Sequence, residues 1–174
     1  AIKDLQDQGM KDLILDLQQN GGGYMDAAIN MINEFMPEGR LIVYTEGKSF
    51  PRSDVYANGT GTCKDAPIVV LTDEISASAS EIFSGAIQDN DRGTIIGRRT
   101  YGKGLVQTQM SLSDGSEMRL TIARYYTPSG RCIQKKYEMG NTDAYDQDIY
   151  NRYMHGEFDS ADSIKMDDSL KYQT

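Results

Sequence analysis

Ser78 and Lys103 are the two residues of this chain whose types could carry out nucleophilic chemistry together. Ser78 lies in the run SASASE (76–81), and Lys103 follows it between two glycines. A serine hydroxyl is a weak nucleophile until a base takes its proton. The single histidine, His155, lies in a polar, acidic tail, whereas a lysine among glycines and apolar residues can be desolvated, which favours the uncharged amine. The sequence therefore predicts a serine–lysine pair, which is a known variant of the hydrolytic constellation.

Four stretches of the chain carry a family resemblance. They are SASASEI (76–82), QDN (88–90), residues 97–107 and LTIARYYTPSG (120–130). Together they resemble the C-terminal processing peptidases, also called tail-specific proteases, and the resemblance covers most of residues 1–137. It implies that Ser78 is the nucleophile and that Lys103 is its general base.

The resemblance also implies roles for the groups around this pair. Gln107 is expected to hydrogen-bond to the lysine and orient it. Ala79 is expected to donate its backbone N–H to the oxyanion, and Gly22 or Gly23 is expected to supply the second donor. The family's usual Asn-Pro-Gly-Gly is Asn-Gly-Gly-Gly here (20–23). The missing proline makes this turn less stiff, but glycines still let the backbone approach a substrate closely.

Each candidate also fits an ordinary structural role. Ser78 and Glu81 match a capping box, in which the serine caps a helix and the glutamate reaches back to its N–H. Lys103 also fits a solvated lysine on a loop. Asp89 suits either a simple acidic residue in the last turn of a helix or a structural or orienting role. Thr100 suits either a loop-shaping hydroxyl or plain turn chemistry. The functional interpretation of Ser78 gains from the presence of the lysine and the glycine turn in the same chain.

Apolar runs and helical spacing predict alternating strands and helices. Ser78 is expected at the junction of a buried strand and a helix. At this position, unpaired N–H groups and the helix dipole favour developing negative charge. Residues 46–65 predict a loop or an irregular hairpin, and Asp114-Gly115 predicts a tight hairpin. The expected strands are 12–17, 41–45, 67–72, 94–97, 105–112 and 118–126, and the expected helices are 1–9, 26–35, 78–90 and a short one at 149–154.

Repeated strand–helix units with uninterrupted apolar strands favour an α/β fold with a mostly parallel sheet flanked by helices. The resemblance further implies the superhelix of ββα units that characterises the Clp protease and crotonase superfamily. At 174 residues, of which 39% are hydrophobic, the chain can bury one substantial core. We expect a catalytic core at 1–137, followed by an acidic appendage or insertion at 138–174 that is partly disordered.

The charge of the chain argues against several classes of partner. The formal net charge is -8, and residues 138–174 carry nine acidic and three basic side chains. An acidic surface repels phosphates, so nucleic acid and anionic membranes are poor partners. Cys63 and Cys132 fit no metal-ligand spacing, and their pairing is left open. We expect no metal or cofactor and no membrane span, and a homo-oligomer is left open.

The chain begins inside a helical pattern, which suggests a fragment of a longer protein. By resemblance, a PDZ domain that captures the substrate's C-terminus precedes this core in relatives, and the bacterial relatives work in the cell envelope, facing the periplasm or the outside. We expect a serine endopeptidase that acts near protein C-termini and has weak or no activity as this piece alone. Three alternatives remain: a non-catalytic binding module like the retinoid-binding repeats, a crotonase-type acyl-CoA enzyme, and a latent subunit that serves assembly.

Overall fold

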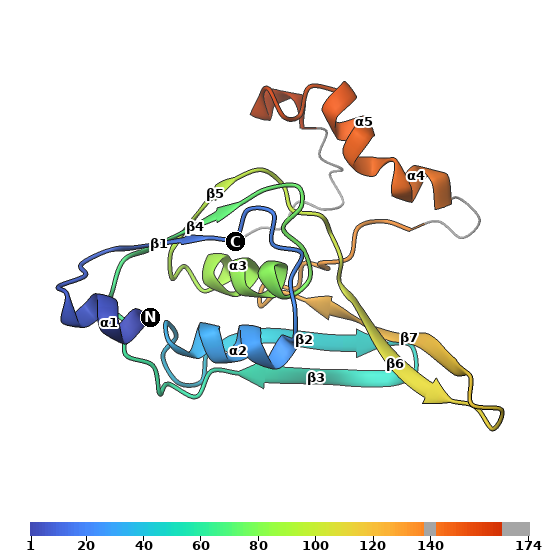
Figure 1. Ribbon diagram of the computed structural model, residues 1–174, viewed down its shortest axis with the longest axis horizontal. Helices are drawn as coiled ribbons and strands as arrows, with labels where there is room; N and C mark the ends of the chain where they lie inside the picture. The colour runs from blue at the N-terminus through green and yellow to red at the C-terminus, as the bar shows by residue number, and fades with distance from the viewer. Residues whose placement is uncertain (138–141, 165–174) are drawn as a thin grey trace.

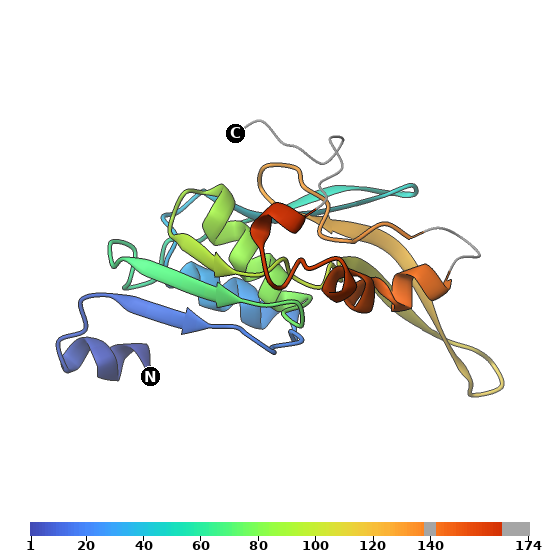
Figure 2. The ribbon, with the colours of Figure 1, turned by 90° about the horizontal axis from the view of Figure 1, so that it is seen from above.

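Two β-sheets with two helices between them form the body of the protein in the computed structural model, which describes residues 1–137 and 142–164 (Figure 1). The elements are α1 (Ile2–Asp7), β1 (Leu13–Asp16), α2 (Met25–Asn33), β2 (Leu41–Gly47), β3 (Phe50–Tyr56), β4 (Ile68–Thr72), α3 (Ala79–Asp89), β5 (Thr94–Gly97), β6 (Leu105–Ser111), β7 (Glu117–Tyr126), α4 (Thr142–Asp146), α5 (Asp148–Met154) and the 3₁₀ turn η1 (Ala161–Ser163). One sheet is parallel, with the order β1-β4-β5, and the other is antiparallel, with the order β3-β2-β7-β6. Figure 2 shows the protein from above, with the three parallel strands side by side in front of α2 and α3.

The hydrophobic core fills the space between these layers. Phe35 and Phe83 meet edge to face at its centre, with ring centroids 5.9 Å apart, and both are almost fully buried. Aliphatic side chains from both sheets surround them, among them Val43 of β2 and Val70 of β4, which are fully buried. Burying one side chain of this size contributes about 1.5–3 kcal/mol. Helix α3 is therefore held from both sides, and so is the residue at its N-terminus, Ser78.

The prediction of an α/β fold is confirmed, but that of a mostly parallel sheet is wrong. Four of the seven strands within the described ranges form the antiparallel sheet. Strands β2 and β3 are joined by residues 48–49, and β6 and β7 by residues 112–116. Connections this short can only join antiparallel neighbours. The predicted hairpin at Asp114-Gly115 is thus present. Of the loop or irregular hairpin expected at 46–65, the structure shows the hairpin, in which β3 pairs with β2 with two shifts of register.

The parallel sheet is buried on one face only. Its outer face carries Ile14, which is 68% exposed, and Ile96, which is 53% exposed. Uninterrupted apolar strands are usual in parallel sheets that are buried on both faces. Only the inner face, which packs on α2 and α3, follows that pattern within the described residues.

Asp89, at the end of α3, ties this helix to the turn after β7. Its carboxylate accepts hydrogen bonds from the N–H and hydroxyl of Ser129 at 3.1 and 2.7 Å, and it pairs with Arg131. Burial opposes ionisation of Asp89, but hydrogen bonds from Thr127 and Ser129 and the contact with Arg131 lower its pKa below the usual value. Of the two roles that the sequence left open for Asp89, these contacts support the structural one.

The expected appendage is described in part. Residues 138–141 and 165–174 lie outside the described residues. The described part, from 142 to 164, contains α4 and α5 and lies beside the residues that follow β5 (Figure 1). Cys63 and Cys132 are both free thiols. Within the described ranges, every helix is too short or too polar to cross a lipid bilayer.

We predict that Asp89→Asn lowers the free energy of unfolding by about 1–3 kcal/mol at neutral pH, because the donors of Ser129 and Arg131 lose a charged acceptor. The folded-state pKa of Asp89 is lowered, so its contribution exists above the carboxyl's ordinary pKa and is lost as pH falls through the folded value. The difference between the variant and the parent should therefore shrink in acid. Urea unfolding at several pH values measures this, with the exposed Asp65→Asn as the control. A difference that is constant with pH would show that the carboxylate charge is not responsible.

Candidate active site

Three chain segments that the sequence singled out meet at one edge of the parallel sheet. The glycine turn 20–23 follows β1, the serine run follows β4, and the lysine loop follows β5. These strands are parallel neighbours in the order β1-β4-β5, so their carboxyl ends share one edge. Ligand sites of open α/β sheets commonly lie at this edge. The topology thus brings the candidate residues together, although they are far apart in the sequence.

The turn between β4 and α3 is fixed by Asp73 and Ser76. The Asp73 carboxylate accepts hydrogen bonds from two N–H groups of its own turn and from the N–H of Gln19 at 2.9–3.0 Å. The Ser76 hydroxyl donates to the carbonyl oxygen of Leu17 at 2.7 Å. Burial opposes ionisation of Asp73, but these donors hold its pKa below the usual value. This role of Asp73 and Ser76 was not predicted from the sequence. The available signal was an aspartate directly after a buried strand, with a serine three residues on.

Ser78 has a strained backbone. Its φ of +53° and ψ of -113° lie in a region that residues with a side chain rarely adopt. Such a conformation costs about 1–3 kcal/mol and persists only where the surroundings impose it. The same device, a sharp strand-to-helix turn, presents the nucleophilic serine of α/β-hydrolases. The Ser78 side chain is half-buried at this turn, so strain is kept at a residue that still reaches the surface.

The Glu81 carboxylate joins the serine turn to the lysine loop. It is 4% exposed and accepts four hydrogen bonds. One oxygen, Oε2, accepts the N–H of Ser78 at 2.9 Å and the N–H of Lys103 at 2.8 Å. The other, Oε1, accepts the Thr100 hydroxyl at 2.7 Å and the N–H of Gly102 at 2.6 Å. Burial raises the pKa of Glu81, and these four donors act against that rise. The predicted capping box is present, and the same glutamate also holds the loop of the proposed base.

The glycine turn lies directly against Ser78 and Ala79. Gly22 has a φ of +94°, and a Cβ placed on it would come within 2.8 Å of the Ala79 nitrogen and 2.7 Å of the Ser78 Cβ, so only glycine fits. The carbonyl oxygen of Asn20 accepts the N–H of Ala77 at 3.0 Å, which fixes this contact. The N–H of Gly22 donates a hydrogen bond to the side-chain oxygen of Asn20 at 2.9 Å. Within the described residues, the N–H groups of Gly23 and Ala79 donate no hydrogen bond.

Lys103 is exposed, whereas the sequence predicted a desolvated lysine. Its flanking glycines do not enclose it. They allow close contact with the chain after β7 instead: a Cβ on Gly102 would lie 2.8 Å from the Cβ of Lys135, and one on Gly104 would lie 2.6 Å from the backbone nitrogen of Gln134. With the glycines turned inward, the lysine side chain points outward. Its Nζ has no hydrogen-bond or ion-pair partner in the described part of the chain, and that includes the Ser78 hydroxyl.

Gln107 does not contact Lys103. It is exposed on β6, and its amide lies 3.5 Å from the hydroxyl of Thr121 on β7. The expected orienting contact is therefore absent between these described residues. The structure thus brings Ser78, Ala79, Glu81 and Thr100 to one edge with the glycine turn and the backbone of Lys103, and it leaves the side chain of Gln107 apart.

An apolar pocket of about 130 Å³ opens beside the unpaired amides. Gly23 and Ala79 lie at its edge, and its walls come mainly from α2 and α3. The apolar lining residues are Leu17, Tyr24, Ala27, Ala28, Met31 and Phe83. This pocket was not predicted from the sequence. A small apolar side chain placed next to the two free N–H groups would fit this space.

We predict that Glu81→Gln lowers the free energy of unfolding by about 1–3 kcal/mol, because either orientation of the amide sets its NH₂ against buried donors. It should also speed hydrogen exchange at the N–H groups of Gly102 and Lys103. Urea unfolding and amide exchange followed by NMR measure the two effects. The control is Glu74→Gln, which removes a surface pair with Arg98 and should change stability by less than about 0.5 kcal/mol. Unchanged exchange in Glu81→Gln would mean that this carboxylate does not hold the loop.

Comparison with known proteins identifies the family of the chain. The family model described as peptidase family S41 matches residues 1–143. The chloroplastic C-terminal processing peptidase of Tetradesmus obliquus is 42% identical over 136 residues, which are 78% of this chain and 29% of that protein. The carboxyl-terminal-processing protease of Synechocystis sp. is 43% identical over 135 residues, 78% of this chain and 31% of that one. A solved photosystem II D1 C-terminal processing protease superposes with a TM-score of 0.73 at 41% identity, over 77% of this chain and 34% of that one.

The chain therefore spans about a third of the length of these relatives. The family match covers most of the chain and includes all three segments that meet at the edge of the parallel sheet. This protein belongs to peptidase family S41.

Proposed function

We propose that this chain is the catalytic core of a serine endopeptidase that cleaves proteins near their C-terminus through an acyl-enzyme on Ser78. One observation carries the proposal: a single oxygen of Glu81 accepts the backbone N–H groups of both Ser78 and Lys103. The backbone N–H groups of the nucleophile and of the base are thus bound to the same oxygen atom. The free N–H groups and the apolar pocket next to Ser78 supply the remaining parts of a hydrolytic site.

In the first step, the Ser78 oxygen attacks the carbonyl carbon of the scissile peptide bond while its proton passes to the uncharged amine of Lys103. The carbonyl oxygen becomes an oxyanion. Ala79 and Gly23 have unpaired N–H groups that can bind it, and the N–H of Gly22 is already used. Gly23 is therefore the better second donor of the two that the sequence left open. A preorganised donor of this kind contributes about 3–4 kcal/mol.

In the second step, the tetrahedral intermediate collapses and the C–N bond breaks. The leaving amine takes the proton from the Lys103 ammonium, and the acyl group stays on Ser78. A water molecule then attacks the ester, Lys103 again accepts the proton, and the acid product leaves as the proton returns to the Ser78 oxygen. Lys103 thus alternates between base and acid, and every proton is accounted for.

The exposure of Lys103 gives the substrate a part in the mechanism. General-base catalysis needs the uncharged amine, which the exclusion of water favours. A peptide bound along the edge of the parallel sheet would cover Lys103 and exclude water from it. Gln107 could then orient the amine, which requires its side chain to leave Thr121. The small pocket beside Ala79 would hold the apolar side chain that precedes the scissile bond.

Further parts of the proposal rest on the relatives. Their names as C-terminal processing proteases support the site of cleavage, and the name of the Tetradesmus protein places that relative in the chloroplast. For this chain we place the protein in an extracytoplasmic compartment, with a carboxylate-capturing PDZ domain as the partner of a core at 1–137. The strand–helix connections of the parallel sheet support assignment to the Clp protease and crotonase superfamily. Without a partner that delivers the substrate, cleavage by this piece is expected to be weak or absent.

A binding module on the same fold is the second candidate, because the Lys103 amine and the Ser78 hydroxyl are not in contact here. The strain at Ser78 favours the enzyme, since a binding module has no need for a serine in that conformation. The crotonase alternative lacks an observation of its own in this structure. A latent subunit would show the same geometry but no reactivity at Ser78.

We predict that a peptidyl fluorophosphonate, which occupies the site as a bound peptide would, labels this chain at Ser78 with a rate that rises with pH, because a general base accepts the serine proton only in its unprotonated form. Ser78→Ala should remove the label, and Lys103→Ala and Lys103→Arg should slow labelling by at least about 100-fold, the usual contribution of a general base. Mass spectrometry of the labelled peptide identifies the modified residue. Lys48→Ala, in the turn between β2 and β3, is the control and should label like the parent. Labelling at another serine, or an unchanged rate in Lys103→Ala, would refute the enzymatic proposal and favour the binding module.

A further inference from the structure

Arg152 is a buried arginine in the C-terminal segment, the described residues 142–164. It contacts the lysine loop, which follows β5. It lies on α5 and is only 4% exposed. Its guanidinium donates to two consecutive carbonyl oxygens of the loop, that of Arg99 at 2.5 Å and that of Thr100 at 3.4 Å. Its Nε pairs with Glu157 at 2.8 Å. Each of the three guanidinium nitrogens of Arg152 therefore donates to an acceptor.

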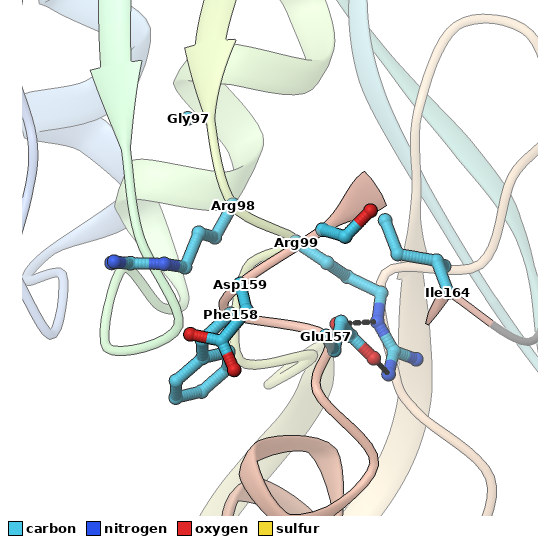
Figure 3. Close-up of a pocket in the computed structure, with 8 residues that line it drawn as sticks. Gly97, Arg98, Arg99, Glu157, Phe158, Asp159 and Ile164 are labelled. Carbon is cyan, nitrogen blue, oxygen red and sulfur yellow. Dashed lines mark hydrogen bonds and ion pairs between the residues drawn. The ribbon is translucent and has the colours of Figure 1, made fainter. Parts of the chain in front are cut away.

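Glu157 joins this arginine to a second one. Its carboxylate also binds Arg99, at 2.8 and 3.1 Å, as the dashed lines in Figure 3 show. Burial opposes ionisation of Glu157, but the hydrogen bonds and charges of Arg99 and Arg152 lower its pKa. A charged pair this deeply buried loses hydration and is stable only when its partners are all in place. Removing Arg152 would therefore disturb Arg99 and Glu157 together.

The same loop is held from the inside by Glu81. The hydroxyl of Thr100 donates to Glu81, while the carbonyl oxygen of Thr100 accepts from Arg152. Residues 99–103 are thus held on one side by the Glu81 carboxylate, which accepts, and on the other by the Arg152 guanidinium, which donates. Lys103 is the last residue of this stretch, and its N–H is bound on the inner side only.

A second contact, made by a residue just before the C-terminal segment, acts on the next residues of the loop. The N–H of Lys135 donates to the carbonyl oxygen of Gly102 at 3.0 Å. The Lys135 ammonium lies 4.3 Å from the ring centre of Tyr101, and it also donates to the carbonyl oxygen of Tyr145 at 3.0 Å. Residues before and within the C-terminal segment therefore hold both ends of the loop, and the family match ends at residue 143, before Arg152.

We infer that Arg152 is a positioning residue for catalysis: by binding the carbonyl groups of Arg99 and Thr100, it fixes the loop that carries Lys103. The inference rests on the proposed function, since it assigns Lys103 the role of base. Arg152 itself lies behind the loop and is not expected to touch the substrate. The C-terminal segment is in this account a part of the active-site structure and not only an appendage.

The test measures fluorophosphonate labelling of Ser78 against pH in the full 174-residue chain. Arg152→Gln should lower the rate at neutral pH by roughly 10- to 100-fold, because a misplaced catalytic group loses its alignment. The dependence of the rate on pH should weaken, because a misaligned base contributes less to the reaction. Arg152→Lys keeps a cationic donor and should recover part of the rate. Tyr150→Ala, on the exposed side of α5, is the matched control and should leave both quantities unchanged.

A second variant covers the case in which Arg152→Gln does not fold. Glu157→Gln removes the carboxylate between the two arginines and should weaken the pH dependence of labelling in the same way, with a smaller loss of rate. The inference is wrong if folded Arg152→Gln keeps the parent's rate and its pH dependence while Lys103→Ala has lost labelling. If Arg152→Gln is unfolded, the same result in folded Glu157→Gln overturns the inference. If Lys103→Ala labels like the parent, the proposed function and this inference both fall.

Discussion

The buried carboxylate of Glu81 is the interaction on which the site depends. It accepts hydrogen bonds from Ser78, Thr100, Gly102 and Lys103, which come from two segments that follow different strands. Burying a carboxylate is costly, and only such a set of donors makes it tolerable. The arrangement is therefore cooperative: if one segment moves, the other loses its acceptor. A residue that the sequence marks as a helix cap thus sets the distance between the nucleophile's backbone and the base's backbone.

The fold explains why such a link can form. Parallel neighbours place the ends of β1, β4 and β5 at one edge, where the glycine turn, the serine turn and the lysine loop emerge. Each turn is then fixed by its own contacts, through Asn20, Asp73 and Glu81. The core between α3 and the two sheets makes the platform rigid. Strain at Ser78 can persist because the residues on both sides of it are held in this way.

The sequence predicted local features well and long-range ones poorly. The serine turn, the capping box and the hairpin at Asp114-Gly115 follow from short-range spacing, so they could be predicted. The β6–β7 hairpin was predicted, and an irregular hairpin was one of two alternatives at 46–65. The β2–β7 pairing that joins them into one sheet was missed, because apolar strands do not reveal their partners. The exposure of Lys103 was missed for a similar reason: it depends on whether the flanking glycines face the chain near residue 134. The contacts of Asp73 with Gln19 and of Arg152 with Arg99 join residues more than fifty positions apart, and no local pattern predicts them.

The central claim is that Ser78 and Lys103 react as a pair, and a crystal structure of the chain with a peptide boronate or aldehyde bound to Ser78 tests it most directly. The account predicts a covalent bond to the Ser78 oxygen, with the Lys103 amine within about 2.6–3.2 Å of it, which is the range for proton transfer. It also predicts the adduct's oxygen on the N–H groups of Ala79 and Gly23. An adduct in which the lysine stays in solvent and the oxygen binds elsewhere would contradict the account.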